Sequence, residues 1–489
     1  MKFLHSHPQL SALLLGAFCV FGFAPFYLFP LPILALAGLF YLWQHASSAR
    51  QAAKLGFIFG LGFFIAGIHW IYISLHDVGG MPWWMAGLAT FGLCAFLALF
   101  HACAGFFSQR LAYAWWAPAI VWTWLEWLRE WLFTGFPWLN VGYSQVPYSP
   151  LANFAPISGI LGVTLAVTLT ALWLIKLSQH WRRLIAIWTL ATVLGMLPWS
   201  NASGPAVQFA LLQGNVPQTL KWDAEVAQQT SLQYYHMMQS AMTQPQQPDV
   251  IVLPETALPY AINRQEIAQH PVTRAFSEYA KSEQVNVVVG VIEQEDEQYY
   301  NSMWAMDVDG GVQRYRKSHL VPFGEFIPFK QWLDWLYRDW LHIPMSDLSR
   351  GHGIGNLTLA GQQVGFNICY EDVFGNEIRR QVPQANILLN TSNDAWYGHS
   401  IAAYQHLQFS QARALESGRW MLRATNTGIS AAINQHGEVV KALPDFVQDS
   451  LYVRVPSLSG TTPYALLGNW LILSCLWLAL LLLWAGKNK

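Results

Sequence analysis

The sequence has 489 residues, enough for two or three domains, and it is 53% hydrophobic and only 11% charged. A soluble protein would carry about 25% charged residues, so the composition excludes a wholly soluble protein. The net charge is −1, and without a long basic segment it offers no electrostatic basis for binding nucleic acid. The apolar runs lie in residues 1–202 and 461–489, whereas residues 203–460 have the composition of a soluble domain.

Apolar runs before residue 203 predict seven membrane-spanning helices, because about 20 apolar residues cross the hydrocarbon core of a bilayer. An eighth run lies near the C-terminus. The run at 30–44 is short and flanked by proline, so it is the weakest of the set. The predicted spans are residues 9–27, 30–44, 55–75, 83–107, 114–133, 157–178, 183–200 and 463–486.

The positions of Lys and Arg predict the orientation of these spans, because cytoplasmic loops are enriched in positive charge. With a cytoplasmic N-terminus, the short outside loops hold only Arg129. We therefore expect residues 203–460 to lie in the periplasm of a bacterium, with both termini on the cytoplasmic side of the inner membrane. The positive residues that then fall inside are Lys2, Arg50, Lys54, Arg110, Lys176, Arg182, Arg183, Lys487 and Lys489.

Charged residues inside a predicted span need a reason, because burying charge in a bilayer is costly. Glu126, Arg129 and Glu130 lie at helical spacing near the outer end of the fifth span. They either pair with one another and brace the bundle, or they contact a lipid headgroup. The sequence leaves both interpretations open.

Strand and helix patterns alternate along residues 203–460, which predicts a layered α/β domain. A hairpin with its turn at Asp309-Gly310-Gly311 follows the third predicted strand. The predicted helices are residues 231–242, 271–284 and 402–421. The other predicted strands are residues 207–213, 249–253, 285–292, 364–368, 386–390 and 428–434.

One cysteine differs from the other four. Cys19, Cys94, Cys103 and Cys475 lie in apolar runs, whereas Cys369 lies in the polar domain. A lone cysteine there cannot form a disulfide within the domain, so Cys369 is a candidate reactive thiol.

Three strand ends bring together a carboxylate, an ammonium and this thiol. Glu255 and Cys369 each follow a predicted strand, and Lys317 follows the predicted hairpin. An open α/β sheet gathers its site from loops at one edge. Glu255 can accept the thiol proton, and the Lys317 ammonium can stabilise the oxyanion of a tetrahedral intermediate. The set is sufficient for covalent acyl transfer, although each residue taken singly has an ordinary structural explanation.

The order Glu255, Lys317, Cys369 with its flanking residues resembles the nitrilase superfamily. The runs Lys-Ser-His-Leu-Val-Pro-Phe-Gly-Glu at 317–325 and Cys-Tyr-Glu at 369–371, within an eight-span frame, resemble the bacterial apolipoprotein N-acyltransferases, as do residues 390–396 and 423–428. This resemblance implies an αββα layered sandwich. It implies that Cys369 takes an acyl chain from a phospholipid as a thioester, and that the α-amine of a diacylglyceryl-cysteine apolipoprotein then accepts the chain.

The resemblance also implies roles for further residues. Glu325, Tyr370 and Glu371 would support the site, and Trp222 would contact substrate. Residues 332–340, with tryptophans at helical spacing, are either a helix that covers the core or an arm that dips into the bilayer. The scattered histidines lack metal-ligand spacing, so we expect no metal and no cofactor, and we expect a monomer.

Two other functions remain compatible with parts of this pattern. A membrane-anchored nitrilase-type amidase would use the same three residues and give the acyl group to water. A transporter with a periplasmic binding domain would show buried charge along several spans and internal repeats, and the sequence has neither feature in evidence. We therefore favour the transferase.

Overall fold

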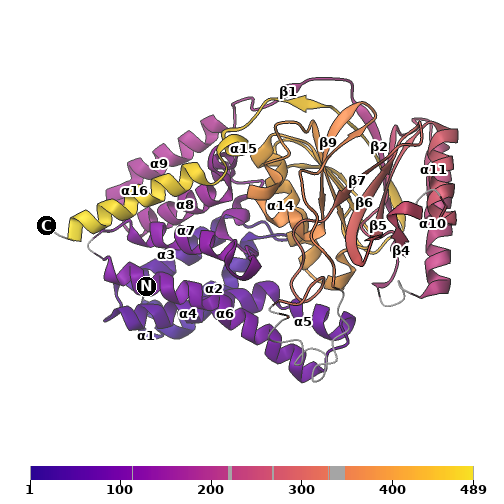
Figure 1. Cartoon of the computed structure of the whole chain (residues 1–489). Helices are drawn as coiled ribbons and strands as arrows, with labels where there is room; N and C mark the ends of the chain where they lie inside the picture. The colour runs from indigo at the N-terminus through magenta and orange to yellow at the C-terminus, as the bar shows by residue number, and fades with distance from the viewer. Residues whose placement is uncertain are drawn as a thin grey trace. The chain divides into compact units, whose positions relative to one another are not determined.

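The computed structural model describes residues 2–112, 114–218, 223–266, 269–328, 330 and 347–487. Its contacts divide the chain into two compact units (Figure 1). The helical unit consists of Met1–Trp199, His399–Glu416 and Thr462–Lys489, and the α/β unit consists of Ser200–Gly398 and Ser417–Thr461.

The helical unit is built from apolar helices joined by short 3₁₀ turns. Several glycines let these helices approach closely: a Cβ on Gly56 would lie 2.2 Å from the backbone oxygen of His101, and one on Gly105 would lie 2.4 Å from that of Ala52. Small residues at helix contacts are typical of membrane bundles. The helices are α1 (Lys2–Ser6), α2 (Pro8–Cys19), α3 (Pro30–Gln44), α4 (Ala49–Ile68), α5 (Ile71–Ile73), α6 (Trp83–Arg110), α7 (Ala117–Arg129), α8 (Ala155–Ile175), α9 (Leu177–Leu194), α14 (Ala402–Ser417), α15 (Pro463–Leu467) and α16 (Trp470–Lys487).

Length and composition identify which of these helices suit a bilayer. Among the described residues, three are long and apolar enough to cross one: Ala49–Ile68, Trp83–Arg110 and Pro150–Ile175. Shorter apolar helices cover Pro8–Gly22, Pro30–Gln44 and Trp470–Ala485. The helices fit a membrane protein, while the number of crossings stays a prediction.

The charged cluster of the fifth predicted span lies inside the helical unit. Glu126 accepts hydrogen bonds from the indole of Trp122 (2.9 Å), the amide of Val141 (2.9 Å) and the hydroxyl of Thr164 (2.7 Å). Arg129 donates to the carbonyl of Trp138 at 2.8 Å. Glu126 and Arg129 are 4% and 2% exposed, so they brace the bundle through contacts with other residues of the helical unit, while their predicted pairing with one another stays a prediction.

Two mixed sheets form the α/β unit, and residues from both share one buried apolar cluster. A second cluster lies between the outer face of the larger sheet and helices α10 (Ala224–Met242) and α11 (Pro271–Glu283). The larger sheet contains β2 (Val207–Gln213), β3 (Val250–Val252), β4 (Leu258–Asn263), β5 (Asn286–Glu295), β6 (Gln298–Met306), β7 (Val312–Arg316) and β14 (Asp449–Val455). The smaller sheet contains β8 (Asn356–Leu359), β9 (Gln362–Ile368), β10 (Ile387–Ser392), β11 (Met421–Thr425), β12 (Ala431–Ile433) and β13 (Val439–Ala442); β1 (Asn201–Ala202) pairs with β15 (Leu458–Ser459), and α13 spans Gly375–Ile378.

A row of polar side chains crosses the centre of the smaller sheet. Strands β9, β10 and β11 are parallel, and their register places Asn367 beside Asn390 and Asn390 beside Arg423. All three side chains are 0% exposed. Buried polar groups at this density must be hydrogen bonded to one another, and the site described below includes them.

Most predicted strands and helices of this unit appear close to their predicted bounds, and the hairpin turn at Asp309–Gly311 lies between β6 and β7 as expected. The predicted helix 402–421 is wrong at its C-terminal end. It stops at Ser417, and residues 421–425 form the buried strand β11. The charge of Arg423 interrupts an otherwise apolar segment, which hid the strand from the sequence pattern. Part of this helix also groups with the helical unit.

Candidate active site

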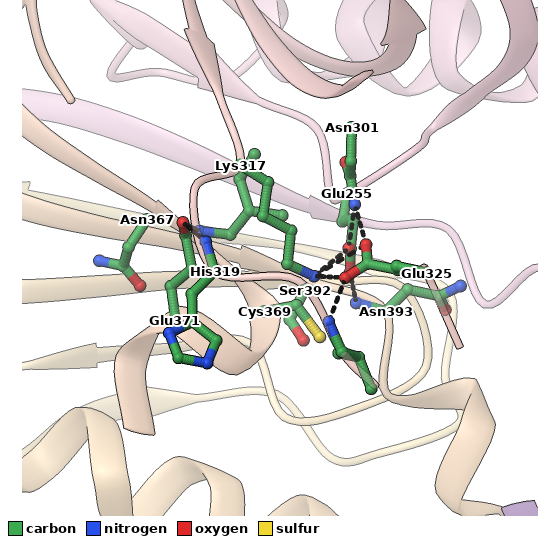
Figure 2. Close-up of polar contacts among 12 residues, drawn as sticks. Glu255, Asn301, Lys317, His319, Glu325, Asn367, Cys369, Glu371, Ser392 and Asn393 are labelled. Atoms are coloured by element: carbon green, nitrogen blue, oxygen red, sulfur yellow. Dashed lines mark hydrogen bonds and ion pairs between the residues drawn. The ribbon is translucent and has the colours of Figure 1, made fainter. Parts of the chain in front are cut away.

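The three residues predicted to carry the chemistry follow three different strands. Glu255 lies just after β3, Lys317 directly after β7 and Cys369 directly after β9. They are 6%, 1% and 7% exposed, respectively. The structure therefore brings a carboxylate, an ammonium and a thiol into one buried site of the α/β unit (Figure 2).

The Lys317 ammonium lies between two carboxylates. Its Nζ atom is 3.4 Å from Oε1 of Glu255 and 2.9 Å from Oε2 of Glu325. Glu325 is also fixed by the amide of Val321, which donates to the same Oε2 atom at 2.8 Å. Figure 2 shows this arrangement with Cys369 beside it. Glu325, which was predicted to support the site, thus lies in an ion pair with Lys317.

Two asparagines that the sequence analysis missed hold the carboxylates in place. The Nδ2 atom of Asn301 donates to Glu255 at 2.7 Å and to Glu325 at 2.9 Å. The backbone amide of Asn393 donates to Oε2 of Glu255 at 2.8 Å. The carbonyl of Asn301 also accepts from the amide of Lys317 at 2.8 Å. The only sequence signal for Asn301 was that it is a polar residue at a buried position of the predicted hairpin.

Glu371 connects the lysine segment to the cysteine turn. It accepts hydrogen bonds from the amides of Ser318 (2.6 Å), His319 (3.1 Å) and Ile368 (2.7 Å). The hydroxyl of Tyr315 donates to it at 2.9 Å. Because these donors flank both Lys317 and Cys369, one buried carboxylate fixes the spacing of the two segments. Burial raises the pKa of Glu371, and the hydrogen bonds from Ile368 and His319 oppose that shift.

The turn at Cys369 has an unusual backbone. Cys369 has a φ of 52°, a left-handed conformation that costs a non-glycine residue roughly 1–3 kcal/mol. The Nδ2 atom of Asn390 donates to the carbonyl of Cys369 at 3.2 Å and to Asn367 at 2.6 Å. Arg423 donates to Oδ1 of Asn390 at 2.9 Å.

Two aspartates complete this support. Arg423 pairs with Asp372 at 2.9 Å and with Asp394 at 3.0 Å. All three side chains are 2% exposed or less. The polar row of the smaller sheet thus supports the strained turn at Cys369 through a fully buried ion network.

The protonation states follow from these surroundings. Burial, and then the charge of Glu255, raise the pKa of the Cys369 thiol well above its ordinary value, although Lys317 acts in the opposite direction. Burial disfavours the charge of Lys317, but Glu325, Glu255 and Cys369 together raise its pKa above the ordinary value. The resting site therefore holds a neutral thiol and a charged ammonium, and the thiol needs a base at the moment of attack.

Gly290 of β5 makes room for the Glu255 segment. A Cβ at this position would lie 2.4 Å from both the carbonyl oxygen of Pro254 and the amide nitrogen of Thr256. No side chain fits without moving that backbone. The segment that carries Glu255 therefore packs directly against a strand of the larger sheet.

The remaining predicted site residues have different outcomes. Tyr370 is 5% exposed, and its ring contacts those of His319 and Phe374. Trp222 and residues 332–340 lie outside the described residues, so their roles stay predictions. Within the described ranges, no group of His, Cys, Asp and Glu could hold a metal ion.

Comparison with known proteins matches two family models to two separate parts of the chain. A model of the apolipoprotein N-acyltransferase N-terminal domain matches residues 15–173, and one of the carbon–nitrogen hydrolases matches residues 208–464. The apolipoprotein N-acyltransferase of Nitrosomonas europaea is 45% identical over 96% of each chain. The chain belongs to the apolipoprotein N-acyltransferase family. The family relative from Chromobacterium violaceum is 41% identical over 98% of this chain and 95% of its own.

Among solved structures, Saccharomyces cerevisiae Nit3, a member of branch 10 of the nitrilase superfamily, covers 52% of this chain and 93% of its own, with 16% identity and a TM-score of 0.40. Membership in the N-acyltransferase family confirms the predicted fold class, a set of apolar helices joined to a nitrilase-like α/β domain. It also confirms that the chain is an acyltransferase, and it disfavours the hydrolase and transporter alternatives.

Proposed function

We propose that this protein transfers a fatty acyl chain from a phospholipid, through a thioester on Cys369, to the α-amine of a diacylglyceryl-cysteine apolipoprotein. The observation that carries the proposal is the meeting of Glu255, Lys317 and Cys369 at one buried site. The full-length similarity to apolipoprotein N-acyltransferases supports it.

The first step forms the acyl-enzyme. Glu255 accepts the thiol proton as the sulfur of Cys369 attacks the ester carbonyl of the phospholipid. The Lys317 ammonium, already oriented by Glu325, stabilises the oxyanion. The carbon–oxygen bond then breaks, and Glu255 returns the proton to the departing alkoxide, which releases a lysophospholipid.

The second step consumes the thioester. A free α-amine has a pKa of about 8, so a useful fraction is neutral at physiological pH. The neutral amine attacks the thioester carbonyl, and Glu255 accepts one of its protons. The carbon–sulfur bond breaks, and the thiolate of Cys369 regains that proton. The products are an amide and the resting enzyme.

Three neighbours would act through these groups. Glu325 and Asn301 position Lys317 and Glu255, and Glu371 fixes the spacing between the lysine and cysteine segments. Tyr370 would line the site beside the thiol. Contact of Trp222 with substrate remains part of the proposal without a structural description.

The acyl-enzyme provides the test. Purified protein in detergent is incubated with acyl-labelled phospholipid, and the label on the protein is challenged with hydroxylamine, which cleaves thioesters. We expect hydroxylamine-labile label in the wild type and none in Cys369→Ala. Addition of a diacylated lipopeptide should move the label onto its amine. Release of the label only as free fatty acid would instead identify a hydrolase.

We also propose a topology. Residues 1–202 and 461–489 would carry the membrane helices, and residues 203–460 would form a periplasmic catalytic domain of the bacterial inner membrane, with both termini cytoplasmic and the enzyme monomeric. The distribution of Lys and Arg supports this orientation. Labelling of single cysteines placed at Lys54 and Lys281 with a membrane-impermeant reagent tests it: only the second should react in intact spheroplasts.

A further inference from the structure

A polar helix of the helical unit interrupts the catalytic strands in sequence. Helix α14 follows Asn393, whose amide binds Glu255, and precedes Arg423, which supports the turn at Cys369. Eight residues separate Asn393 from the start of the helix at Ala402, and five separate its end at Ser417 from Arg423. Whatever fixes α14 therefore acts on both catalytic strands through short covalent links.

Three glutamines fix α14 within the helical unit. Gln405, Gln408 and Gln411 recur at every third position, so they are neighbours on the helix surface. They are 2%, 2% and 1% exposed. Each of them is hydrogen bonded to a residue that lies more than 200 positions away in the sequence.

The partners of these amides are backbone and ring groups where the membrane helices are interrupted. Gln405 accepts from the indoles of Trp70 (3.1 Å) and Trp138 (2.7 Å) and donates to the carbonyl of Gly67 at 3.1 Å. Gly67 lies at the last turn of α4. A polar side chain that serves an interrupted backbone at such a position replaces water that the bilayer lacks.

The next two glutamines continue the pattern. Gln408 accepts from the amide of Ala24 (3.1 Å) and donates to the carbonyl of Val146 (2.9 Å), and both partners lie beyond the ends of short helices. Gln411 accepts from the hydroxyl of Tyr27 at 3.0 Å. The amides of Gln405 and Gln408 both donate and accept, which is how a buried amide avoids an unpaired group.

We propose that Gln405, Gln408 and Gln411 are positioning residues that anchor the catalytic strands to the membrane helices and thereby set the site for donors that remain in a bilayer. This inference rests on the proposed phospholipid donor. Acyl transfer to the Cys369 thiol does not need these glutamines, but delivery of a lipid that stays embedded in the bilayer does. Loss of the glutamine contacts should therefore slow the reaction with a bilayer donor and leave the reaction with a dispersed donor unchanged.

The experiment compares two donors of the same headgroup. One is a long-chain phospholipid in vesicles with reconstituted full-length enzyme, and the other is a short-chain phospholipid dispersed below its micellar concentration. In Gln411→Leu and Tyr27→Phe, which remove the same hydrogen bond from either side, thioester formation from the bilayer donor should fall about tenfold, as expected for a displacement of roughly an ångström or less. Formation from the dispersed donor should stay within about twofold.

Further variants guard against a purely structural explanation. The Tyr27→Phe/Gln411→Leu double variant should lose no more than Gln411→Leu alone, because that single change already removes the hydrogen bond to Tyr27. Gln405→Leu, which removes the acceptor for both indoles and the donor to Gly67, should lose at least as much with the bilayer donor as Gln411→Leu. Gln239→Leu, on an exposed part of α10, is the matched control and should change neither rate.

Equal losses with both donors would overturn the inference and show that the α14 contacts serve only the stability of the fold. Unchanged rates with both donors would overturn it as well. A failure of the proposed function is distinct, since the wild type would then form no thioester with either donor.

Discussion

Both units bury charge, but they surround it differently. In the helical unit, the carboxylate of Glu126 is surrounded by an indole, an amide and a hydroxyl that only donate to it. In the α/β unit, two carboxylates share one ammonium at Lys317, next to a thiol. The first arrangement satisfies a charge and leaves it inert. The second leaves a carboxylate in excess of its cations, which is what a proton acceptor requires.

The largest effect should come from the thiol itself. Cys369→Ala removes the nucleophile and should lower transfer by at least about 10⁴-fold, since loss of a catalytic nucleophile costs that much or more in related chemistry. Transfer is measured as label reaching the lipopeptide amine. Cys475→Ala in α16 should leave transfer unchanged; a comparable loss there would contradict the assignment of the reactive thiol to the α/β unit.

Removal of the shared ammonium should come next. Lys317→Met should lower thioester formation by about 10²–10³-fold, because the oxyanion loses its cation. It also leaves Glu255 and Glu325 facing each other, which should destabilise the fold by about 3–5 kcal/mol. Thermal unfolding in detergent measures this. The double variant with Glu325→Gln should recover stability but not activity, and recovery of activity would refute the role of Lys317.

The packing of the base segment offers a third test. Gly290→Ala places a methyl group against the backbone around Glu255, and the displacement should lower transfer by about 10²-fold. The comparison is Gly87→Ala in α6, where a Cβ meets nothing within 4 Å. That variant should keep full activity. Equal rates in both variants would mean that the position of Glu255 is not critical.

The raised pKa of Cys369 predicts slow alkylation of its thiol, an effect smaller than the three losses of activity above. Alkylation of the free enzyme by iodoacetamide, taken as the difference from Cys369→Ala, should be slow at pH 8 and rise about tenfold per pH unit without a plateau through pH 10. Because Glu255 contributes to the shift, Glu255→Gln should speed alkylation roughly tenfold at pH 8 while it blocks transfer. A plateau near pH 7 in the wild type would show a resting thiolate.

The raised pKa of Cys369 also makes the free energy of unfolding depend on pH. The folded thiol has a higher pKa than the unfolded one, so its contribution is complete below the ordinary thiol pKa of 9.0 and is lost as the pH rises above it. Wild type should therefore lose stability between pH 9 and 10 relative to Cys369→Ala. Mass spectrometry of the alkylated site and thermal unfolding give the two measurements.

The smallest effect on chemistry should come from the helical unit. Glu126→Gln cannot accept all three of its hydrogen bonds, so it should lower the free energy of unfolding by about 1–3 kcal/mol. Transfer per folded molecule should stay within about twofold. Glu278→Gln on α11, whose side chain is 66% exposed, is the control for stability. A large loss of transfer in Glu126→Gln would remove the contrast between the two units.

The sequence predicted the parts of the site that short local patterns encode. Glu255 and Cys369 were identified because each follows a strand whose apolar run is visible, and Lys317 because it follows the predicted hairpin. Asn301 was missed because its role depends on the pairing of β6 with β7 and on a loop 24 residues further along. The strand that carries Arg423 was missed because the charge of that residue resembles an exposed position. Its partners become visible only when three strands are aligned.

For the helical unit, the sequence predicted where the apolar helices lie but not which residues contact one another. Apolar runs located the helices, but nothing in the pattern of α14 indicated that its glutamines would be buried against Trp70, Ala24 or Tyr27. A helix rich in polar residues is normally assigned to a solvated surface. The partners of its glutamines are distant in the chain, and half of the partners named above are backbone groups, which carry no signature of residue type.

The polar row across β9, β10 and β11 has a consequence for biogenesis. A one-residue slip of β11 would place Arg423 opposite Leu389 or Thr391 instead of Asn390, away from the aspartates that neutralise it. An unpaired guanidinium in that interior costs several kcal/mol, so a misaligned chain cannot close its sheet. The buried arginine in this way specifies the alignment of the three strands that carry the polar row.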